Sequence, residues 1–408
     1  MRRSSCVCTT LLAVCVVAAI SLQAQDNAGK SAANASTSEN SKPRARDLGI
    51  PFDGTPGPLN AITDVAGVTV GHTTLISGEG KLQVGKGPVR TGVTAVLPRG
   101  KDSMNSSVFA GWWSLNGNGE MTGTTWVEES GFLEGPVMIT NTHSVGVVRD
   151  AVIQWRVSHG APDASGYWWS LPVVAETWDG WLNDTNGFHV KPEHAFHAID
   201  TASSGPVAEG SVGGGTGMIC NSFKGGIGTS SRRFQIKGAG EYTVGVLVQC
   251  NYGTKDNLRI AGIPVGREID APMPYTQTRF ENEDRGSIIV VVATDAPLVS
   301  TQLKRLARRV SLGLGRDGSI SGDGSGDIFI AFSTANSGAS ANDHVVDVKM
   351  LPNDMIEQVF ASTVFATEEA IVNAMIAGDT MVGADNHKII GLPHDQLQAI
   401  LKKYNRLQ

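Results

Sequence analysis

A serine stands where a polar segment meets a run of β-branched residues. Residues 281–285 read Glu-Asn-Glu-Asp-Arg, Gly286 and Ser287 follow, and residues 288–292 read Ile-Ile-Val-Val-Val. A serine hydroxyl is a weak nucleophile unless a base takes its proton. If the peptide bond before Ser287 is cut, its own α-amine, with a reference pKa of about 7.7–8.0, becomes that base. The junction indicates either an N-terminal nucleophile or, on this segment alone, an ordinary loop-to-strand turn.

The same segment fits self-cleavage. Ser287 could attack the Gly286 carbonyl and move the acyl group from nitrogen to oxygen, which requires an unusual backbone that glycine adopts at the least cost. The buried strand would hold the hydroxyl, and the polar segment could move away and open a site. The motifs G-x-S-x-G, H-E-x-x-H and G-x-x-x-x-G-K-[ST] are absent, so other common hydrolase and nucleotide sites have no signature here.

The composition is that of a globular protein with a large core. The chain has 408 residues, of which 41% are hydrophobic and 18% are charged, and its formal net charge is −6. Lys and Arg form no block, and the tight basic cluster Lys304-Arg305 with Arg308-Arg309 has the spacing of a solvated helix face. We therefore expect no nucleic-acid partner.

The N-terminus has the pattern of an export signal. Met1-Arg2-Arg3 is basic, residues 11–22 are apolar but too few to span a bilayer, and Ala24 suits a cleavage site. We predict a signal peptide over residues 1–24 and a periplasmic location, with no membrane span after export. Residues 25–48 are rich in Ser, Asn and Ala, and we predict a disordered leader there.

Two cysteines remain once the signal peptide is removed. Cys220 and Cys250 each end an apolar, strand-like run. In an oxidising compartment they could pair, but two cysteines are not a disulfide framework. We expect both to be buried free thiols, and the sequence leaves their pairing open.

Apolar patterns predict a single layered α/β domain over residues 49–408. Runs rich in β-branched residues predict strands at residues 68–75, 92–97, 137–140, 171–176, 218–220, 242–250, 287–293, 327–332 and 345–348. Helical spacing predicts helices at residues 145–157, 192–202, 298–314, 354–377 and 395–404. All eight tryptophans precede residue 182, which suits either an aromatic-lined cleft or plain core packing.

A histidine-rich segment offers a competing site. His194 and His197 are three residues apart on a predicted helix, Asp200 is three residues further, and His189 precedes them. Residues three apart share a helix face, so a zinc site is geometrically possible. An exposed polar helix face explains the same pattern, and we adopt that interpretation, with no metal.

Other polar motifs have ordinary explanations. Residues 322–327 (Gly-Asp-Gly-Ser-Gly-Asp) could form a flexible turn or a loose calcium-binding turn. Asn251 could form a turn after its strand, and Glu176 could lie on a solvated loop edge. Residues 210–217 lack the lysine and the spacing of a phosphate loop, and residues 141–144 read as a helix N-cap rather than a catalytic histidine.

Five stretches together resemble one known family. They are PVVAETWDGWLND (172–184), GTGMICNSFKGGIGTSSR (215–232), VGVLVQCNYG (244–253), RGSIIVVVATDAPL (285–298) and GSGDIFIAFSTAN (324–336). Their order and spacing are similar to those of the self-cleaving serine aminopeptidases, which include the L-aminopeptidase D-Ala-esterase/amidase and the β-peptidyl aminopeptidases. The resemblance implies a four-layer αββα sandwich, cleavage between Gly286 and Ser287 into chains of residues 25–286 and 287–408, and a tetramer of such pairs.

The resemblance also implies roles for particular residues. Ser287 matches the nucleophile. Ser325 and Asp327 match the Ser-Gly-acid pair of that family. There the serine accepts or relays the proton of the nucleophile, and the acid orients the pair. Gly326 through its N–H, and Asn251 through its side-chain amide, match the donors that bind the oxyanion.

Two further residues match the substrate-binding positions of that family. Glu176 matches the acid that pairs with the free amino group of the substrate, and Trp178 resembles the β-peptidyl branch, since another branch has Tyr there. We therefore predict an oligomeric serine aminopeptidase that releases N-terminal residues, β-amino acids first, from short peptides, amides and esters through an acyl-enzyme on Ser287, without a cofactor. The alternatives are an L-aminopeptidase with D-amide or D-ester activity, an acyltransferase of the same fold, and an uncut binding protein.

Overall fold

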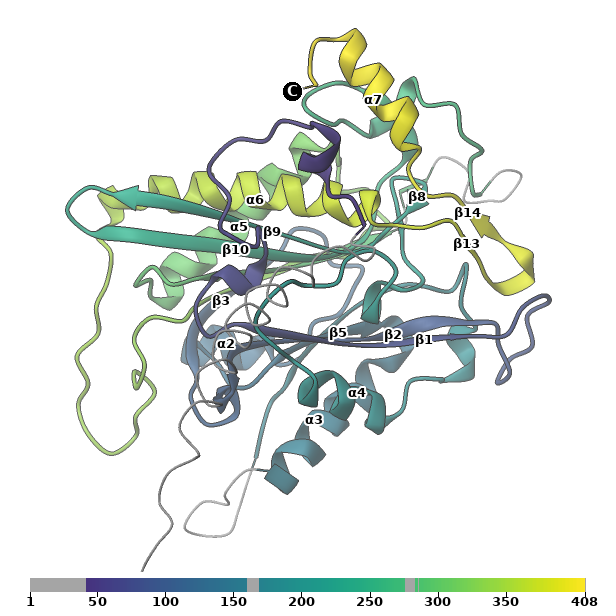
Figure 1. Cartoon of the computed structure of the whole chain (residues 1–408). Helices are drawn as coiled ribbons and strands as arrows, with labels where there is room; N and C mark the ends of the chain where they lie inside the picture. Colours follow the sequence, from purple (N-terminus) through teal and green to yellow (C-terminus); the bar gives the residue numbers. More distant parts are fainter. Residues whose placement is uncertain (1–41, 160–168, 276–282, 285, 408) are drawn as a thin grey trace, which may run out of the picture. The chain divides into compact units, whose positions relative to one another are not determined.

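Two large β-sheets with helices outside them form most of the described part of the chain (Figure 1). A computed structural model describes residues 42–159, 169–275, 283–284 and 286–407, and a compact unit begins at Pro43. The predicted signal peptide and most of the polar segment before Gly286 lie outside these residues. The predicted mixed α/β class is confirmed.

The larger sheet has its strands in the order β4-β3-β12-β11-β10-β9. Their bounds are Val108–Ser114 (β3), Phe132–Leu133 (β4), Gly226–Ile236 (β9), Gly240–Asn251 (β10), Ser287–Thr294 (β11) and Asp327–Ser333 (β12). β11 and β12 are parallel, and the other neighbouring pairs are antiparallel. β11 is central and buried along its whole length, which explains its unbroken apolar sequence.

The smaller sheet has the order β1-β2-β5-β6. Its strands are Thr69–Ser77 (β1), Val89–Lys101 (β2), Val137–Asn141 (β5) and Val173–Thr177 (β6). β5 and β6 are parallel, so their carboxyl ends meet at one edge of the sheet. Two small hairpins complete the strands, and they are β7 (Ile219–Cys220) with β8 (Phe223–Lys224), and β13 (Met381–Val382) with β14 (Lys388–Ile389).

Helices cover the outer faces of both sheets (Figure 1). The described α-helices are Thr124–Ser130 (α2), Val145–His159 (α3), Pro192–Asp200 (α4), Ser300–Arg316 (α5), Glu357–Ile376 (α6) and His394–Lys403 (α7). α5 and α6 pack on the six-stranded sheet, and α3 and α4 pack on the four-stranded sheet. The packing order is therefore helix, sheet, sheet, helix.

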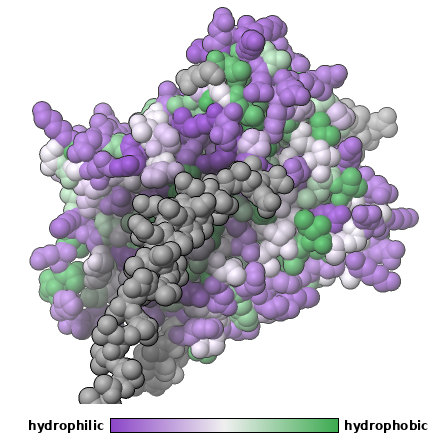
Figure 2. Space-filling view, in the orientation of Figure 1, coloured by the Kyte–Doolittle hydropathy of each residue, from purple (hydrophilic) through white to green (hydrophobic). Residues whose placement is uncertain are grey.

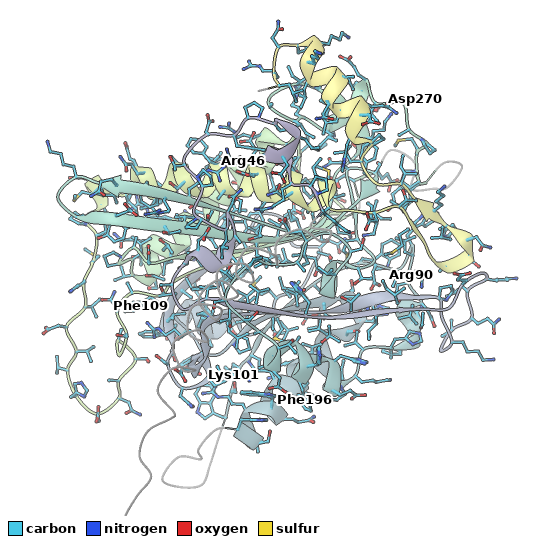
Figure 3. All side chains as sticks on the ribbon, in the orientation of Figure 1. Arg46, Arg90, Lys101, Phe109, Phe196 and Asp270 are labelled. Atoms are coloured by element: carbon cyan, nitrogen blue, oxygen red, sulfur yellow. A yellow bond between two sulfur atoms is a disulfide. The ribbon has the colours of Figure 1, made fainter. Side chains whose placement is uncertain are left out.

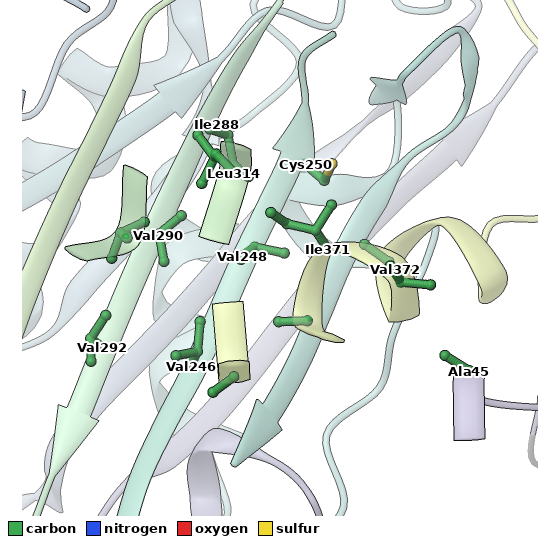
Figure 4. Packing of buried hydrophobic residues seen from close by; sticks show 14 of the residues in the cluster. Ala45, Val246, Val248, Cys250, Ile288, Val290, Val292, Leu314, Ile371 and Val372 are labelled. Atoms are coloured by element: carbon green, nitrogen blue, oxygen red, sulfur yellow. The ribbon is translucent and has the colours of Figure 1, made fainter. Parts of the chain in front are cut away.

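Three large apolar clusters separate these layers. One lies between the six-stranded sheet and α5 with α6, one between the two sheets, and one between the four-stranded sheet and α3 with α4. In β11, Ile288 and Val290 belong to the first cluster (Figure 4), whereas Ile289 and Val291 belong to the second. Because side chains alternate along a strand, Ser287 points toward the four-stranded sheet.

α6 belongs to the core. Among the described residues, it is the one helix long and apolar enough to cross a membrane, but 78% of its apolar window is buried inside the fold. The outer surface differs from this helix. On the face drawn in Figure 2, hydrophilic residues predominate and hydrophobic ones form small separate groups.

The structure differs from the predicted elements in places. The strand predicted at residues 345–348 is wrong, because this segment has no strand pairing and Val345 is 97% exposed. β3, β9 and α2 have no predicted counterpart. β9 consists largely of small and polar residues, and the close approach of α6 explains this: a Cβ on Gly228 would lie 2.0 Å from the Ala370 carbonyl oxygen.

The folded unit begins before the predicted leader ends. Residues Ala45–Leu48 form a short 3₁₀ helix, η1, and Ala45 is fully buried with its N–H donating to Asn373 Oδ1 at 3.0 Å. Arg46, labelled in Figure 3, forms an ion pair with Glu369 at 2.8 Å. The prediction of a disordered leader is therefore wrong for residues 43–48, because these residues pack against α6.

Cys220 and Cys250 are joined in a disulfide. Both are fully buried, as expected, but the expectation of free thiols is wrong. β7 lies against the end of β10 and brings the two Cα atoms to 5.6 Å, a separation typical of bonded cysteines. The pairing depends on this contact between segments that are 30 residues apart in the chain.

Candidate active site

Ser287 begins β11 between two other strands that carry predicted site residues. Asn251 of β10 lies directly opposite Ser287, and Asp327 of β12 pairs with Ile288. Ser287 is buried, and its Oγ accepts a hydrogen bond from the Gly326 N–H at 3.1 Å. The sheet thus brings together motifs that are far apart in the sequence.

Glycines lie beside Ser287 because the backbone is too close for a side chain. A Cβ on Gly286 would lie 1.7 Å from the Asn251 carbonyl oxygen, and one on Gly326 would lie 2.4 Å from the Asn118 carbonyl oxygen. Tight packing against β10 therefore explains why position 286 is a glycine.

The side-chain amide of Asn251 has a fixed orientation. Its Oδ1 accepts from the Ile219 N–H at 2.7 Å, and its Nδ2 donates to the Trp178 carbonyl at 2.9 Å. Since one partner is a donor and the other an acceptor, a flipped amide would lose both hydrogen bonds. An amide nitrogen carries two hydrogens, so the second remains for a ligand in the cavity that Asn251 lines.

Ser325 and Asp327 form a buried pair on either side of Gly326. Ser325 Oγ donates to Asp327 Oδ1 at 2.7 Å, and Ser321 Oγ donates to Asp327 Oδ2 at 2.7 Å. Burial raises the pKa of Asp327, and the two hydroxyl donors offset part of that rise. Because the Ser325 hydroxyl hydrogen points to Asp327, the oxygen lone pairs of Ser325 can still accept a proton.

Glu176 faces the site from the four-stranded sheet. It lies near the end of β6, where its Oε1 accepts from the Glu120 N–H at 3.0 Å and its Oε2 accepts from the Thr142 hydroxyl. Burial raises the pKa of Glu176, while the hydrogen bonds from Thr142 and Glu120 lower it. A carboxylate held in this way can pair with a positively charged amino group.

One cavity of about 310 Å³ is lined by Ser287, Asn251 and Glu176. Its walls are formed by Asn118, Thr142, Glu176, Trp178, Ile219, Asn251, Tyr252, Gly253, Tyr275, Glu283, Gly286, Ser287 and Gly324. Glu176 and Thr142 make one part polar, whereas Trp178, Ile219 and Tyr275 supply apolar surface. Of the two uses expected for tryptophan, the cleft lining applies to Trp178.

The competing histidine site does not assemble. The three histidines have different neighbours, which are Asp184 for His189 (2.9 Å), the Lys191 N–H for His194 (2.9 Å) and Thr73 for His197 (3.1 Å). Asp200 accepts from the Trp155 indole at 3.0 Å. In the part of the chain that the structure describes, no three His, Cys, Asp or Glu side chains are grouped as metal ligands.

Comparison with known families decides the classification. Residues 60–389 match peptidase family S58, which is most of the chain. The chain belongs to peptidase family S58.

Relatives of this S58 peptidase are similar over nearly the full length. It is 58% identical over 390 residues to the β-peptidyl aminopeptidase BapA of Sphingosinicella microcystinivorans, covering 93% of this chain and 96% of that protein. It is 48% identical over 387 residues to BapA of Sphingosinicella xenopeptidilytica, covering 90% and 93%. The predicted family and the predicted class of serine aminopeptidase are confirmed.

A solved structure supports the same classification. The L-aminopeptidase D-Ala-esterase/amidase of Ochrobactrum anthropi is 48% identical, has a TM-score of 0.83, and the match covers 90% of this chain and 100% of that one. That protein is described as a prototype for the serine aminopeptidases and a new variant among the Ntn hydrolase fold. The S58 peptidase therefore has a fold of this kind.

Sequence reasoning missed several cavity residues of this S58 peptidase. They are Asn118, Thr142, Ile219, Tyr252, Gly253, Tyr275, Glu283 and Gly324. Thr142 had a usable signal, because a polar residue directly after a parallel strand lies at the edge where neighbouring strands also end. Residues Thr142–Ser144 form a 3₁₀ turn before α3, and Thr142 contacts Glu176. Tyr275 had no such signal, because it lies in a turn outside the strands.

Proposed function

We propose that this S58 peptidase is a self-processing β-peptidyl aminopeptidase whose nucleophile is Ser287. The observation that carries the proposal is one cavity that holds Ser287, whose Oγ lies 3.1 Å from the Gly326 N–H, and the buried carboxyl group of Glu176. A hydroxyl beside a backbone donor suits acyl transfer, and an acid in the same cavity suits a substrate with a free amine.

In the first stage, Ser287 cleaves the chain before itself. Its Oγ attacks the carbonyl carbon of Gly286, the C–N bond breaks, and the proton lost from the hydroxyl reaches the released nitrogen through Ser325 and Asp327. Water then hydrolyses the ester between Gly286 and Ser287 Oγ. The products are residues 25–286, ending in the Gly286 carboxylate, and residues 287–408, beginning with the free amine of Ser287.

In the second stage, the α-amine of Ser287 takes the hydroxyl proton as Oγ attacks the carbonyl carbon of the first residue of the substrate. The Gly326 N–H and the Asn251 side-chain N–H donate to the oxyanion that forms. The leaving amine receives the proton, and water hydrolyses the acyl-enzyme. The protein supplies the base, the nucleophile and the oxyanion donors, so this chemistry requires no cofactor.

The substrate is a short peptide, amide or ester with a free N-terminal amine, which pairs with Glu176. Relatives named β-peptidyl aminopeptidases, 58% and 48% identical, support a β-amino acid as the first residue, as does Trp178. An α-amino acid substrate is the second candidate, because the relative from Ochrobactrum is named an L-aminopeptidase and D-Ala-esterase/amidase. A serine in place of threonine argues against the acyltransferase alternative.

Export and assembly complete the proposal. The basic and apolar pattern of residues 1–24 supports transport to the periplasm. We also propose a tetramer of processed chain pairs. Cell fractionation and light scattering of the purified protein test these two points, and a cytoplasmic location or a single chain pair in solution would contradict them.

Intact-mass spectra test self-processing. For the folded wild type we expect two fragments, the smaller beginning at Ser287, and for Ser287→Ala we expect one uncut chain. A single full-length mass for both proteins would contradict the mechanism, because the α-amine of Ser287 would not exist.

Hydrolysis of matched anilides tests the substrate class. We expect faster release of aniline from β-homoalanine anilide than from L-alanine anilide. The reverse order would favour an L-aminopeptidase. Transfer to an added amine at a rate far above hydrolysis would favour an acyltransferase.

A further inference from the structure

The end of β10 presents two different residues to opposite faces of the sheet. Cys250 belongs to the apolar cluster between the sheet and α5 with α6, where Figure 4 shows its sulfur. Asn251 lines the cavity and lies opposite Ser287. Because successive strand residues point to opposite faces, Cys250 lies behind the sheet yet shares a peptide bond with a cavity residue.

Three contacts hold the β7–β8 hairpin against this end of β10. These are the hydrogen bond from the Ile219 N–H to Asn251 Oδ1 (2.7 Å), the one from the Asn221 N–H to the Tyr252 carbonyl (2.7 Å), and the Cys220–Cys250 disulfide. Each strand of the hairpin has only two residues, so its own pairing does little to fix its position. Of these three contacts, the disulfide is the covalent one.

The Ile219 N–H and the Trp178 carbonyl together fix which way the Asn251 amide points. With Oδ1 held by Ile219, Nδ2 faces the Trp178 carbonyl and the cavity. A shift of β7 by about 1 Å would break the hydrogen bond to Oδ1 and leave only the bond to the Trp178 carbonyl to orient the amide. Cys220 directly follows Ile219, so the bond from Cys220 to Cys250 limits that shift.

We infer that the Cys220–Cys250 disulfide is a positioning element for an oxyanion donor. It acts through the Ile219 N–H, which holds the Asn251 amide with its nitrogen toward the reacting carbonyl. The inference rests on the proposed function of Asn251 in the mechanism. Protein without the disulfide is therefore expected to bind substrate normally but to turn it over more slowly.

Alkylation tests the bond itself. The exported, processed protein is purified and then unfolded. Iodoacetamide is added with or without a reductant, and the mass of each chain is measured. We expect no alkylated cysteine without reductant and two with it. Two alkylated cysteines without reductant would overturn the inference.

A double-mutant cycle tests whether the disulfide acts through Asn251. Removing one oxyanion donor lowers kcat by about 10²–10³-fold, so a misdirected donor is expected to lower it by about tenfold. We expect that loss for Cys220→Ala/Cys250→Ala with β-homoalanine anilide, with KM changed by less than about twofold. In an Asn251→Ala background, the same cysteine substitutions should lower kcat by less than about twofold, because the donor is already absent.

Val248→Ala is the matched control for lost packing. Val248 lies in β10 on the same face and in the same apolar cluster as Cys250, two positions away. We expect this variant to lower Tm while leaving kcat near the wild-type value. A comparable fall of kcat in Val248→Ala would show that general loosening of the strand explains the cysteine result, and this would overturn the inference.

The remaining outcomes separate the inference from the proposed function. If Asn251→Ala loses activity but the cysteine substitutions lower kcat equally in both backgrounds, the disulfide is structural only and the inference alone fails. If Asn251→Ala keeps full activity, Asn251 is not an oxyanion donor, and both this part of the proposed mechanism and the inference fail. Should the cysteine variant not fold, reduction of the processed wild type with counted thiols replaces it: kcat should fall, return on reoxidation, and stay unchanged in Asn251→Ala.

Discussion

The Glu176 side chain is buried, and each of its two carboxyl oxygens accepts a hydrogen bond. Its two oxygens accept from the Glu120 N–H and the Thr142 hydroxyl, so the carboxyl group is held in one place before a substrate arrives. Burial raises its pKa above the ordinary glutamate value of about 4.3. Only the ionised form pairs with an ammonium group, so binding is expected to weaken as the pH falls through this raised pKa.

Glu176→Gln is predicted to lower kcat/KM by about 100-fold, mainly through KM, because a charge-assisted pair with the substrate amine is lost. The Ser287 α-amine must also lose its proton to act as the base, so the wild-type profile of kcat/KM against pH should show two acid limbs. The limb that Glu176 contributes, above the ordinary glutamate pKa, should vanish in the variant, and the limb of the α-amine should remain. Glu120→Gln is the control, since Glu120 contacts Glu176 through its backbone N–H. A change of less than twofold in Glu176→Gln would remove the amine-binding role.

At the scale of elements, the pairing of β10 with β11 determines the geometry before Ser287. The strands are in register up to Asn251 and Ser287, so the next residue, Gly286, passes directly against the Asn251 carbonyl. A side chain there would force β11 and β10 apart at this end and displace Ser287 from its position against the Gly326 N–H, which lies beside β12 on the other side of β11. The pairing of β10 with β11 therefore requires a glycine at position 286, as the proposed cleavage does.

Gly286→Ala is predicted to slow self-cleavage at least tenfold, because its Cβ would need to lie 1.7 Å from the Asn251 carbonyl oxygen. The fraction of cleaved chain against time after synthesis, measured by intact mass, tests this. Gly315→Ala is the control: this glycine lies in α5, and a Cβ there meets nothing within 4 Å. If Gly286→Ala were cleaved at the wild-type rate, this result would contradict the tight-packing explanation.

At the scale of the whole molecule, the two proposed chains are interleaved. β11 and β12 come from the smaller chain, yet they lie between β10 and β3 of the larger one. At the other end of the larger chain, η1 packs against α6 of the smaller chain, where Arg46, Arg232 and Asn60 all contact Glu369. Cleavage at Gly286 would therefore leave the chains joined by a continuous sheet and a buried ionic contact.

Arg46→Ala is predicted to destabilise the processed protein by about 1–3 kcal/mol, since a buried carboxylate loses one of its partners while Arg232 remains. Thermal unfolding at pH 7 tests this. Lys403→Ala, which removes an exposed ion pair with Glu268, is the control and should leave Tm nearly unchanged. Equal Tm values for Arg46→Ala and the wild type would show that η1 contributes little to holding the chains together.

The sequence by itself determined the features that have a local pattern. The apolar run after Ser287 predicted a buried strand, the spacing in residues 298–314 predicted a helix, and the motifs around Ser287, Asn251 and Ser325 pointed to one family. These predictions needed only neighbours in the chain, because strand alternation, helix periodicity and characteristic strings of residues are all read over short stretches.

The tertiary structure decided what depends on contacts between distant segments. The Cys220–Cys250 bond, the contact of Thr142 with Glu176 and the ordered residues 43–48 each join parts of the chain that have no shared local pattern. β9 shows the same limit, since its small residues fit the close approach of α6 from a distant part of the chain. Burial and pairing of this kind are properties of the packed layers, and no window of the sequence contains both partners.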